Sequence, residues 1–243
     1  MSAVDLATLL KLVGKLDDSS KPGSASARLR DYLETDVQSV GDLRAYVETA
    51  LSTSGDQYNK ALQDLINHAG QLLGFDVRFG RYRGVAGEIG DDGFWRSPTG
   101  RALVVEVKTT DVYTVKTATL LGYINALVSA GELRNAEEAL GLDVYGRFDS
   151  AASQLENAIV VENNQNRLRV VRVDAVLNLL ELQKEYELEH ETAVQLLLPS
   201  PVRLDPIINL IFDITAQERR AAVEEPPRAI PDDEPATGEE QIS

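Results

Sequence analysis

The segment Gly87–Thr110 reads Gly-Glu-Ile-Gly-Asp-Asp-Gly-Phe-Trp-Arg-Ser-Pro-Thr-Gly-Arg-Ala-Leu-Val-Val-Glu-Val-Lys-Thr-Thr. Within it, Pro98 suits the first corner of a type I turn, and Gly100 suits the left-handed position that follows. The segment therefore predicts two strands joined by a three-residue loop, with Ser97 opposite Arg101.

The pairing of these two strands brings three charged residues together. Counting back from the loop, Asp92 lies opposite Glu106. Because side chains alternate along a strand, Lys108 shares the face of Glu106. A two-residue turn would shift the register and place Asp91 opposite Glu106 instead. The first register predicts a sheet face that carries Asp92, Glu106 and Lys108.

These three residues suit metal-dependent chemistry. Two carboxylates a few ångströms apart repel each other, and a divalent cation between them relieves the repulsion. A neighbouring lysine can stabilise developing negative charge or help to orient and deprotonate an attacking water. In a solvated hairpin the same side chains would only face water. However, Leu103–Val107 is almost wholly apolar, as in a central strand, where an unused acid and lysine are costly. We therefore predict metal ligands at Asp92 and Glu106 and a catalytic Lys108.

The motif has a known counterpart. Asp92-Gly93, a gap of about a dozen residues, and then Glu106-Val107-Lys108 resembles the PD-(D/E)XK, or restriction-endonuclease-like, nuclease superfamily. The resemblance implies an α/β fold with a small mixed sheet flanked by helices. It also implies Mg²⁺-dependent or Mn²⁺-dependent hydrolysis of DNA, with Asp92, rather than Asp91, as the aspartate that binds metal.

The order of the expected elements also matches that superfamily: one helix, three strands, a helix, a strand, a helix and a strand. Apolar periodicity and breaker residues predict these elements. Beside the two hairpin strands, they are a helix at 56–73, a strand at 75–79, a helix at 115–131, a strand at 142–148, a helix at 150–161 and a strand at 167–173.

Gln63 is the one departure from the pattern. The helix at 56–73 carries a single apolar stripe and ends in Leu73-Gly74-Phe75. In the superfamily, this helix often brings a glutamate to the metal site, and the matching position here is Gln63. As a catalytic candidate, Gln63 would hold a water beside the metal; otherwise it is an ordinary polar residue of the helix.

Basic residues near the acidic hairpin are the candidates for DNA binding. Arg78, Arg81 and Arg83 alternate with aromatic residues and glycine, which suits phosphate contact. Lys116 stands where the helix at 115–131 begins. The alternative is that all four are solubilising surface residues.

Composition limits the remaining possibilities. The chain has 243 residues, 43% of them hydrophobic, so it can form one sizeable core. It has no cysteine, which excludes disulfides and thiol catalysis. The two histidines, His68 and His190, are far apart, and we expect structural roles for both. No ATP-binding loop is visible. No apolar run is long enough to span a membrane and no signal pattern is visible, so we expect a cytoplasmic protein without membrane contact.

Apolar periodicity and composition divide the chain into three regions. A helical N-terminal segment covers 1–54, with helices at 4–16, 25–35 and 40–52. The nuclease-like domain covers 55–220 and ends in further helices: one that Asp174 caps and that runs to about Tyr186, one at 191–198, and one that begins at Asp205 or Pro206 and includes Ile207 to Ile214. The remaining residues, 221–243, form an acidic tail that we expect to be disordered.

The charge of the chain complicates DNA binding. Its net charge is -15, which argues against a broadly DNA-coating surface. We therefore expect a local basic groove, a homo-oligomer, or a protein partner such as an ATPase or helicase. The most favoured function is a metal-dependent DNA endonuclease of restriction, anti-phage defence or repair. The alternative is a non-cutting subunit with a nuclease fold that serves interactions in a larger complex.

Overall fold

The computed structural model describes residues 4–19, 21–84, 89–108, 116–146 and 150–198. The chain divides into two compact units, residues 1–204 and 205–243, and the described residues all belong to the first. The expected helix at 207–214 and the expected disordered tail therefore lie outside the described residues. Among the described residues, no helix is long and apolar enough to cross a lipid bilayer.

Three helices form the N-terminal part: α1 (Leu6–Val13), α2 (Ala25–Asp36) and α3 (Val40–Ser52). The first is shorter than the predicted 4–16. Its N-terminus is capped by Asp5, whose carboxylate accepts from the Thr8 N–H, and it ends at Gly14, which has a φ of 91°. The helix α3 begins as predicted, because the Ser39 hydroxyl accepts from the Asp42 N–H.

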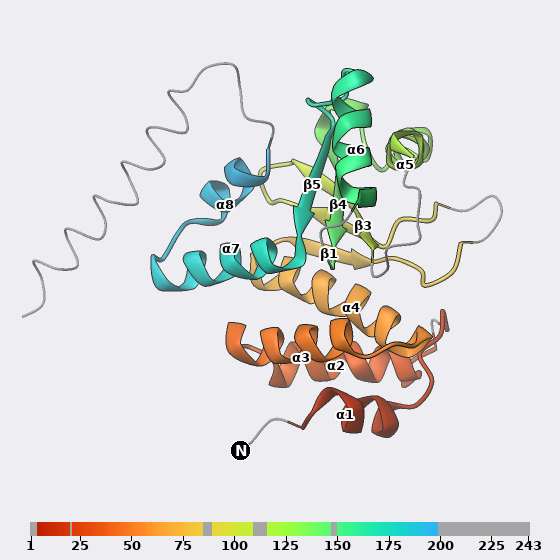
Figure 1. Cartoon of the computed structure of the whole chain (residues 1–243), viewed down its shortest axis with the longest axis vertical. Coiled ribbons are helices and arrows are strands. Elements are labelled where there is room, and N and C mark those ends of the chain that lie inside the picture. Colours follow the sequence, from red (N-terminus) through yellow and green to blue (C-terminus); the bar gives the residue numbers. More distant parts are fainter. Residues whose placement is uncertain (1–3, 20, 85–88, 109–115, 147–149, 199–243) are drawn as a thin grey trace, which may run out of the picture. The chain divides into compact units, whose positions relative to one another are not determined.

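The helix α4 (Asp56–Leu72) lies between these helices and the sheet (Figure 1). The predicted apolar stripe packs in the core, and the polar residues of the helix are buried as well, because every residue from Lys60 to Gly70 is buried. The helices α2 and α3 cover one side of α4, and the first three strands cover the other. The polar residues of α4 must therefore find partners inside the protein.

The sheet has five strands in the order β1-β2-β3-β4-β5. The first three strands are antiparallel, and β3–β4 and β4–β5 are parallel pairs, so the sheet is mixed, as expected. The central strand β3 is buried along nearly its whole length. The strands are β1 (Asp76–Phe79), β2 (Gly93–Arg96), β3 (Ala102–Lys108), β4 (Ala139–Tyr145) and β5 (Leu168–Arg172).

The predicted register of the hairpin is confirmed. The Ser97 N–H donates to the Arg101 carbonyl at 2.7 Å, and Gly100 has a φ of 93°. From this loop the two strands pair residue by residue, without a bulge, from Arg96 and Ala102 to Gly93 and Val105. Asp92 comes next, at the end of the ladder and beside Glu106.

Helices cover both faces of the sheet (Figure 1). On one face, the N-terminal helices, α4, α7 and α8 share a core with Leu103, Val105 and Val107. On the other, α5 and α6 pack on the opposite side of the same strand. These helices are α5 (Thr117–Ser129), α6 (Ser150–Val161), α7 (Val173–Glu185) and α8 (His190–Leu197), with a short 3₁₀ turn at Ala136–Glu138.

Two further differences from the predicted boundaries have a clear physical reason. The strand β4 begins at Ala139 rather than 142, because Gly141 lies inside the strand and does not break it. A Cβ on Gly141 would fall 2.6 Å from the Leu168 side chain, so this glycine permits close packing. The helix α7 begins at Val173, and Asp174 lies in its first turn instead of capping it.

Candidate metal and phosphodiester site

The expected acidic residues meet at the carboxyl-terminal end of β3. Asp92 stands just before β2, and Glu106 and Lys108 are among the last residues of β3. All three line an open cleft of about 730 Å³, which α4 and α5 also border. Its other lining residues are Asp56, Asn59, Lys60, Gln63, Arg81, Tyr82, Gly84, Gly90, Val107 and Tyr123.

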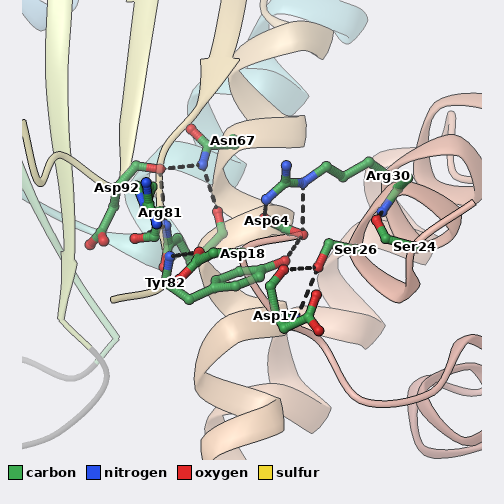
Figure 2. Close-up of polar contacts among 12 residues, drawn as sticks. Asp17, Asp18, Ser24, Ser26, Arg30, Asp64, Asn67, Arg81, Tyr82 and Asp92 are labelled. Carbon is green, nitrogen blue, oxygen red and sulfur yellow. Dashed lines mark hydrogen bonds and ion pairs between the residues drawn. The ribbon is translucent and has the colours of Figure 1, made fainter. Parts of the chain in front are cut away.

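The backbone of Asp92 is fixed by three donors that converge on its carbonyl oxygen. The Gly80 N–H donates at 2.9 Å, Asn67 Nδ2 at 2.8 Å and Gln63 Nε2 at 3.2 Å. Figure 2 shows Asn67 beside Asp92. Two of these donors come from α4, so the buried helix sets the position of this residue.

The side chain of Asp92 continues the hairpin where the regular ladder stops. Its Oδ2 accepts from the Val107 N–H at 2.6 Å, while its own N–H donates to the Val105 carbonyl at 3.0 Å. The Asp92 carboxylate is thereby tied to the strand that carries Glu106.

The glycine after Asp92 is required by close packing. A Cβ on Gly93 would fall 1.9 Å from Asn67 Oδ1, which accepts from the indole N–H of Trp95 at 2.8 Å. The Asp-Gly pair of the motif therefore has a structural reason: Asn67 can bind the Asp92 carbonyl only if residue 93 has no side chain.

Glu106 and Lys108 form an ion pair through Glu106 Oε1, so the predicted common face is confirmed. The other oxygen, Glu106 Oε2, is buried and has no hydrogen-bond partner among the described residues. Burial raises the pKa of Glu106, the Lys108 charge opposes that shift, and Asp91 adds to it. Burial, and then the Glu106 charge, raise the pKa of Asp92 well above its usual value. The two carboxylates therefore carry charge together at a cost that a cation would remove.

The carboxylate oxygens of this site fit a hard divalent cation held by two carboxylates. Mg²⁺ characteristically keeps several waters and takes only one or two carboxylates from a protein. Asp92 and Glu106 could supply that pair, with the orphaned Glu106 Oε2 as one ligand. Within the described part of the chain, no group of three or more His, Cys, Asp or Glu side chains is placed to enclose a metal ion.

Gln63 lines the cleft. Its Nε2 donates to the carbonyls of Asp92 and Arg81, at 3.2 and 3.3 Å. The Gln63 amide group thus fixes the backbone of two residues that line the cleft, Asp92 and Arg81. A role for Gln63 in holding a water stays a prediction.

Asp91 and Asp92 point into different surroundings. Asp91 lines a neighbouring hollow of about 710 Å³ and lies 3.9 Å from the Arg78 guanidinium. Burial raises the pKa of Asp91, and the Arg78 charge opposes that shift. The cleft that contains Glu106 is lined by Asp92.

The predicted DNA-binding residues do not gather at one place. Arg81 lines the cleft, and Arg83 and Lys116 are exposed without lining it. Arg78 instead binds Glu132 at 2.6 Å and stacks over the ring of Phe94. Its charge is therefore partly neutralised inside the protein.

Three residues at or beside the site were missed in the sequence. Lys60 and Tyr123 line the cleft, and Asp143 of β4 pairs with Glu106 in the parallel ladder. Burial, and then the charges of Glu106 and Asp92, raise the pKa of Tyr123 to about 12. Asp143 could have been suspected, because it is an acid inside an apolar strand, as Glu106 is.

A polar network joins the cleft wall to the N-terminal helices (Figure 2). Asp64 of α4 is buried and accepts two bonds from the Arg30 guanidinium, at 3.0 and 3.1 Å. The Tyr82 hydroxyl also donates to Asp64 at 2.5 Å, and the Tyr82 N–H donates to Asp18 at 2.7 Å. Tyr82, which follows Arg81 in this loop, is thereby fixed through both its side chain and its backbone.

Both histidines have structural partners. His68 Nε2 lies 2.7 Å from the Val37 carbonyl, and His190 Nδ1 lies 2.8 Å from the Leu73 carbonyl. Neither residue lines the cleft.

Another hollow, of about 540 Å³, lies at the opposite end of the sheet, where β3, β4 and β5 begin. Arg101 and Arg167 line it, with Glu137 and Glu138. It is far from the buried carboxylates, so we place the candidate site in the cleft.

No protein-family model matches the chain, and no curated protein matches it in sequence. The fold is a mixed α/β arrangement with helices on both faces of a five-stranded sheet.

Proposed function

We propose that the chain is a metal-dependent nuclease that hydrolyses DNA phosphodiester bonds, with a restriction-endonuclease-like core. The observation that carries this proposal is the pair of carboxylates, Asp92 and Glu106, beside Lys108 in one open cleft. Buried like charges without a full set of partners favour a bound cation over a purely structural role.

Each residue would have a distinct part in the reaction. Asp92 and Glu106 would hold Mg²⁺ or Mn²⁺, which when bound supplies a Lewis acid for the phosphate. Lys108 would stabilise the negative charge that builds up on the phosphate, or orient the attacking water. Gln63 and Asn67 would keep Asp92 in place through its carbonyl oxygen. Arg81, on the wall of the cleft, is the candidate for phosphate contact.

The negative net charge of the whole chain favours a second subunit that contributes to substrate binding. With a net charge of -15, the isolated chain should bind duplex DNA weakly, since affinity comes largely from neutralised phosphates. We propose that a second copy of the chain, or a partner subunit, supplies further positive charge. Restriction, defence against foreign DNA and repair all fit this description.

A second candidate is a subunit that keeps the fold but does not cut. The internal pairing of Arg78 with Glu132 and Asp91 favours it, because it removes one expected phosphate contact.

Plasmid cleavage separates the two candidates. The full chain is incubated with supercoiled plasmid and Mn²⁺, with and without a chelator. We expect nicked or linear product that requires the metal. Intact plasmid at high protein concentration, in both Mn²⁺ and Mg²⁺, would favour the non-cutting subunit.

A further inference from the structure

The hollow lined by Asp91 lies next to the cleft and has the dimensions of a ligand pocket. Its volume of about 710 Å³ falls within the range of about 300–1,000 Å³ that is usual for such pockets. Residues of β1, of the segment before β2 and of α5 line it, and those from α5 are small: Ala126, Ser129 and Ala130. The hollow therefore offers space for a ligand beside the candidate site of hydrolysis.

Asp91 is the polar group of this hollow that lacks sufficient partners. Its side chain is only 4% exposed, and its Oδ2 has no hydrogen-bond partner among the described residues. The guanidinium of Arg78 lies 3.9 Å from Oδ1, which is beyond the distance of a hydrogen bond. Buried carboxylates are nearly always hydrogen-bonded or paired with a cationic group. The Asp91 carboxylate thus suits a ligand that donates N–H groups.

Arg78 gives the hollow a flat surface. Its Nη1 donates to Glu132 at 2.6 Å, and its guanidinium carbon lies 5.1 Å from the centre of the Phe94 ring. These two contacts fix the guanidinium plane, while 45% of the side chain stays exposed. Planar guanidinium groups stack on the rings of unpaired bases. Arg78 can therefore hold a flat aromatic ligand even though its charge is paired with Glu132.

We propose that this hollow binds one unpaired guanine base of the substrate, stacked on Arg78 and hydrogen-bonded to Asp91. A phosphate does not fit, because the Asp91 carboxylate would repel it. Guanine carries two neighbouring donors, N1–H and the 2-amino group, which match a carboxylate that only accepts. Both donors are used in a base pair, so the base must come from a single strand or be turned out of a duplex.

The position of the hollow links this base to the cleft. The Cα atoms of Asp91 and Asp92 are about 3.8 Å apart because the residues are consecutive. Arg81 lines both the hollow and the cleft. A strand with a phosphate at Asp92 and Glu106 can therefore place a nearby base at Asp91. In this respect the inference rests on the proposed function, and it adds that the substrate is unpaired next to the cleft.

The test measures binding of labelled single-stranded oligonucleotides to the full chain by fluorescence anisotropy, at low salt and in chelator. Each probe is a short thymidine strand with one central guanine, hypoxanthine or adenine; hypoxanthine lacks the 2-amino group. We expect the guanine probe to bind at least about fivefold more tightly than the other two. Asp91→Asn should abolish this preference. Asp76→Asn, on the exposed start of β1, makes the same change of charge and should keep it.

The outcomes distinguish this inference from the proposed function. Equal affinity of the wild type for the three probes, or no binding of any, would overturn the guanine pocket. A preference that Asp91→Asn retains would overturn it as well. If the wild type nevertheless cuts plasmid with Mn²⁺, the nuclease stands and only the pocket is wrong. A guanine preference without any cleavage would keep the pocket and contradict the nuclease. The wild-type comparison alone tests the inference should the variant fail to fold.

Discussion

At the scale of single residues, the site depends on which of two consecutive aspartates faces Glu106. Asp92 is oriented by bonds to its carbonyl and by the Val107 N–H, whereas Asp91 faces Arg78. We therefore expect Asp92→Asn to weaken Mn²⁺ binding at least tenfold and Asp91→Asn to change it little, as measured by calorimetric titration. The reverse ranking would mean that the cation lies on the Arg78 side of the hairpin.

A second prediction concerns pH and Asp143. Burial, and then the Glu106 charge, raise the pKa of Asp143 from 3.8 to about 8. The protonated form therefore favours the folded state, and this contribution is present below 3.8 and is lost as the pH rises through about 8. In chelator, the free energy of unfolding should fall across this window, with each pKa unit worth about 1.4 kcal/mol.

The control for this pH effect is Asp143→Asn, which cannot lose a proton. Denaturant unfolding at about pH 5 and about pH 8 should show a smaller loss of stability in this variant than in the wild type. Equal losses in the two proteins would show that Asp143 is not protonated in the folded, metal-free chain.

At the scale of secondary structure elements, the β2–β3 hairpin is held to α4 through a position that only glycine fits. Gly93→Ala would place a methyl group against Asn67, so we expect a loss of about 1–3 kcal/mol in the free energy of unfolding. Gly122→Ala on α5 is the control, because no described residue lies within 4 Å of its added Cβ and alanine favours a helix. Similar melting temperatures for both variants would argue against the tight contact between α4 and β2.

The N-terminal helices are tied to the cleft by the buried pair of Arg30 and Asp64. Arg30→Ala leaves the Asp64 carboxylate buried without its counter-charge, which should cost about 3–5 kcal/mol. Arg44→Ala breaks the more exposed pair with Glu181 and should cost about 1 kcal/mol or less. Chemical denaturation measures both. An Arg30→Ala loss as small as that of Arg44→Ala would show that the N-terminal helices do not depend on this pair.

The elements also show what the sequence could predict. The hairpin register followed from local chemistry, because Pro98 and Gly100 fix the length of the loop. The β4 boundary was missed because Gly141 looks like a strand breaker until Leu168, far along the chain, is seen to pack against it. Local pattern predicts turns and periodicity, but it cannot show which distant side chain fills a gap.

The same limit applied to the site. Asp92, Glu106 and Lys108 were found because they lie on one hairpin, where alternation fixes their faces. Asp143 comes from another strand, and only the parallel register places it beside Glu106. Arg78 looked like a phosphate ligand because its partner Glu132 is remote in sequence.

At the scale of the whole molecule, net charge opposes the proposed substrate. Residues 221–243 hold seven acidic residues and one arginine, so they contribute six of the fifteen net negative charges. Their removal should strengthen DNA binding modestly at low salt and leave the melting temperature unchanged. Fluorescence anisotropy over a salt series tests this. Unchanged affinity at every salt concentration would show that this charge does not act on the bound DNA.

The most direct test of the account is metal-dependent plasmid cleavage by a variant that changes one atom of the site. Glu106→Gln removes the cleft carboxylate and keeps the size of the side chain, whereas Glu34→Gln makes the same change on the exposed face of α2. With Mn²⁺, the wild type and Glu34→Gln should cut equally, and Glu106→Gln should be slower by at least about a hundredfold while it melts as a folded protein. Full activity of a folded Glu106→Gln variant would contradict the assignment of the cleft as the site of hydrolysis.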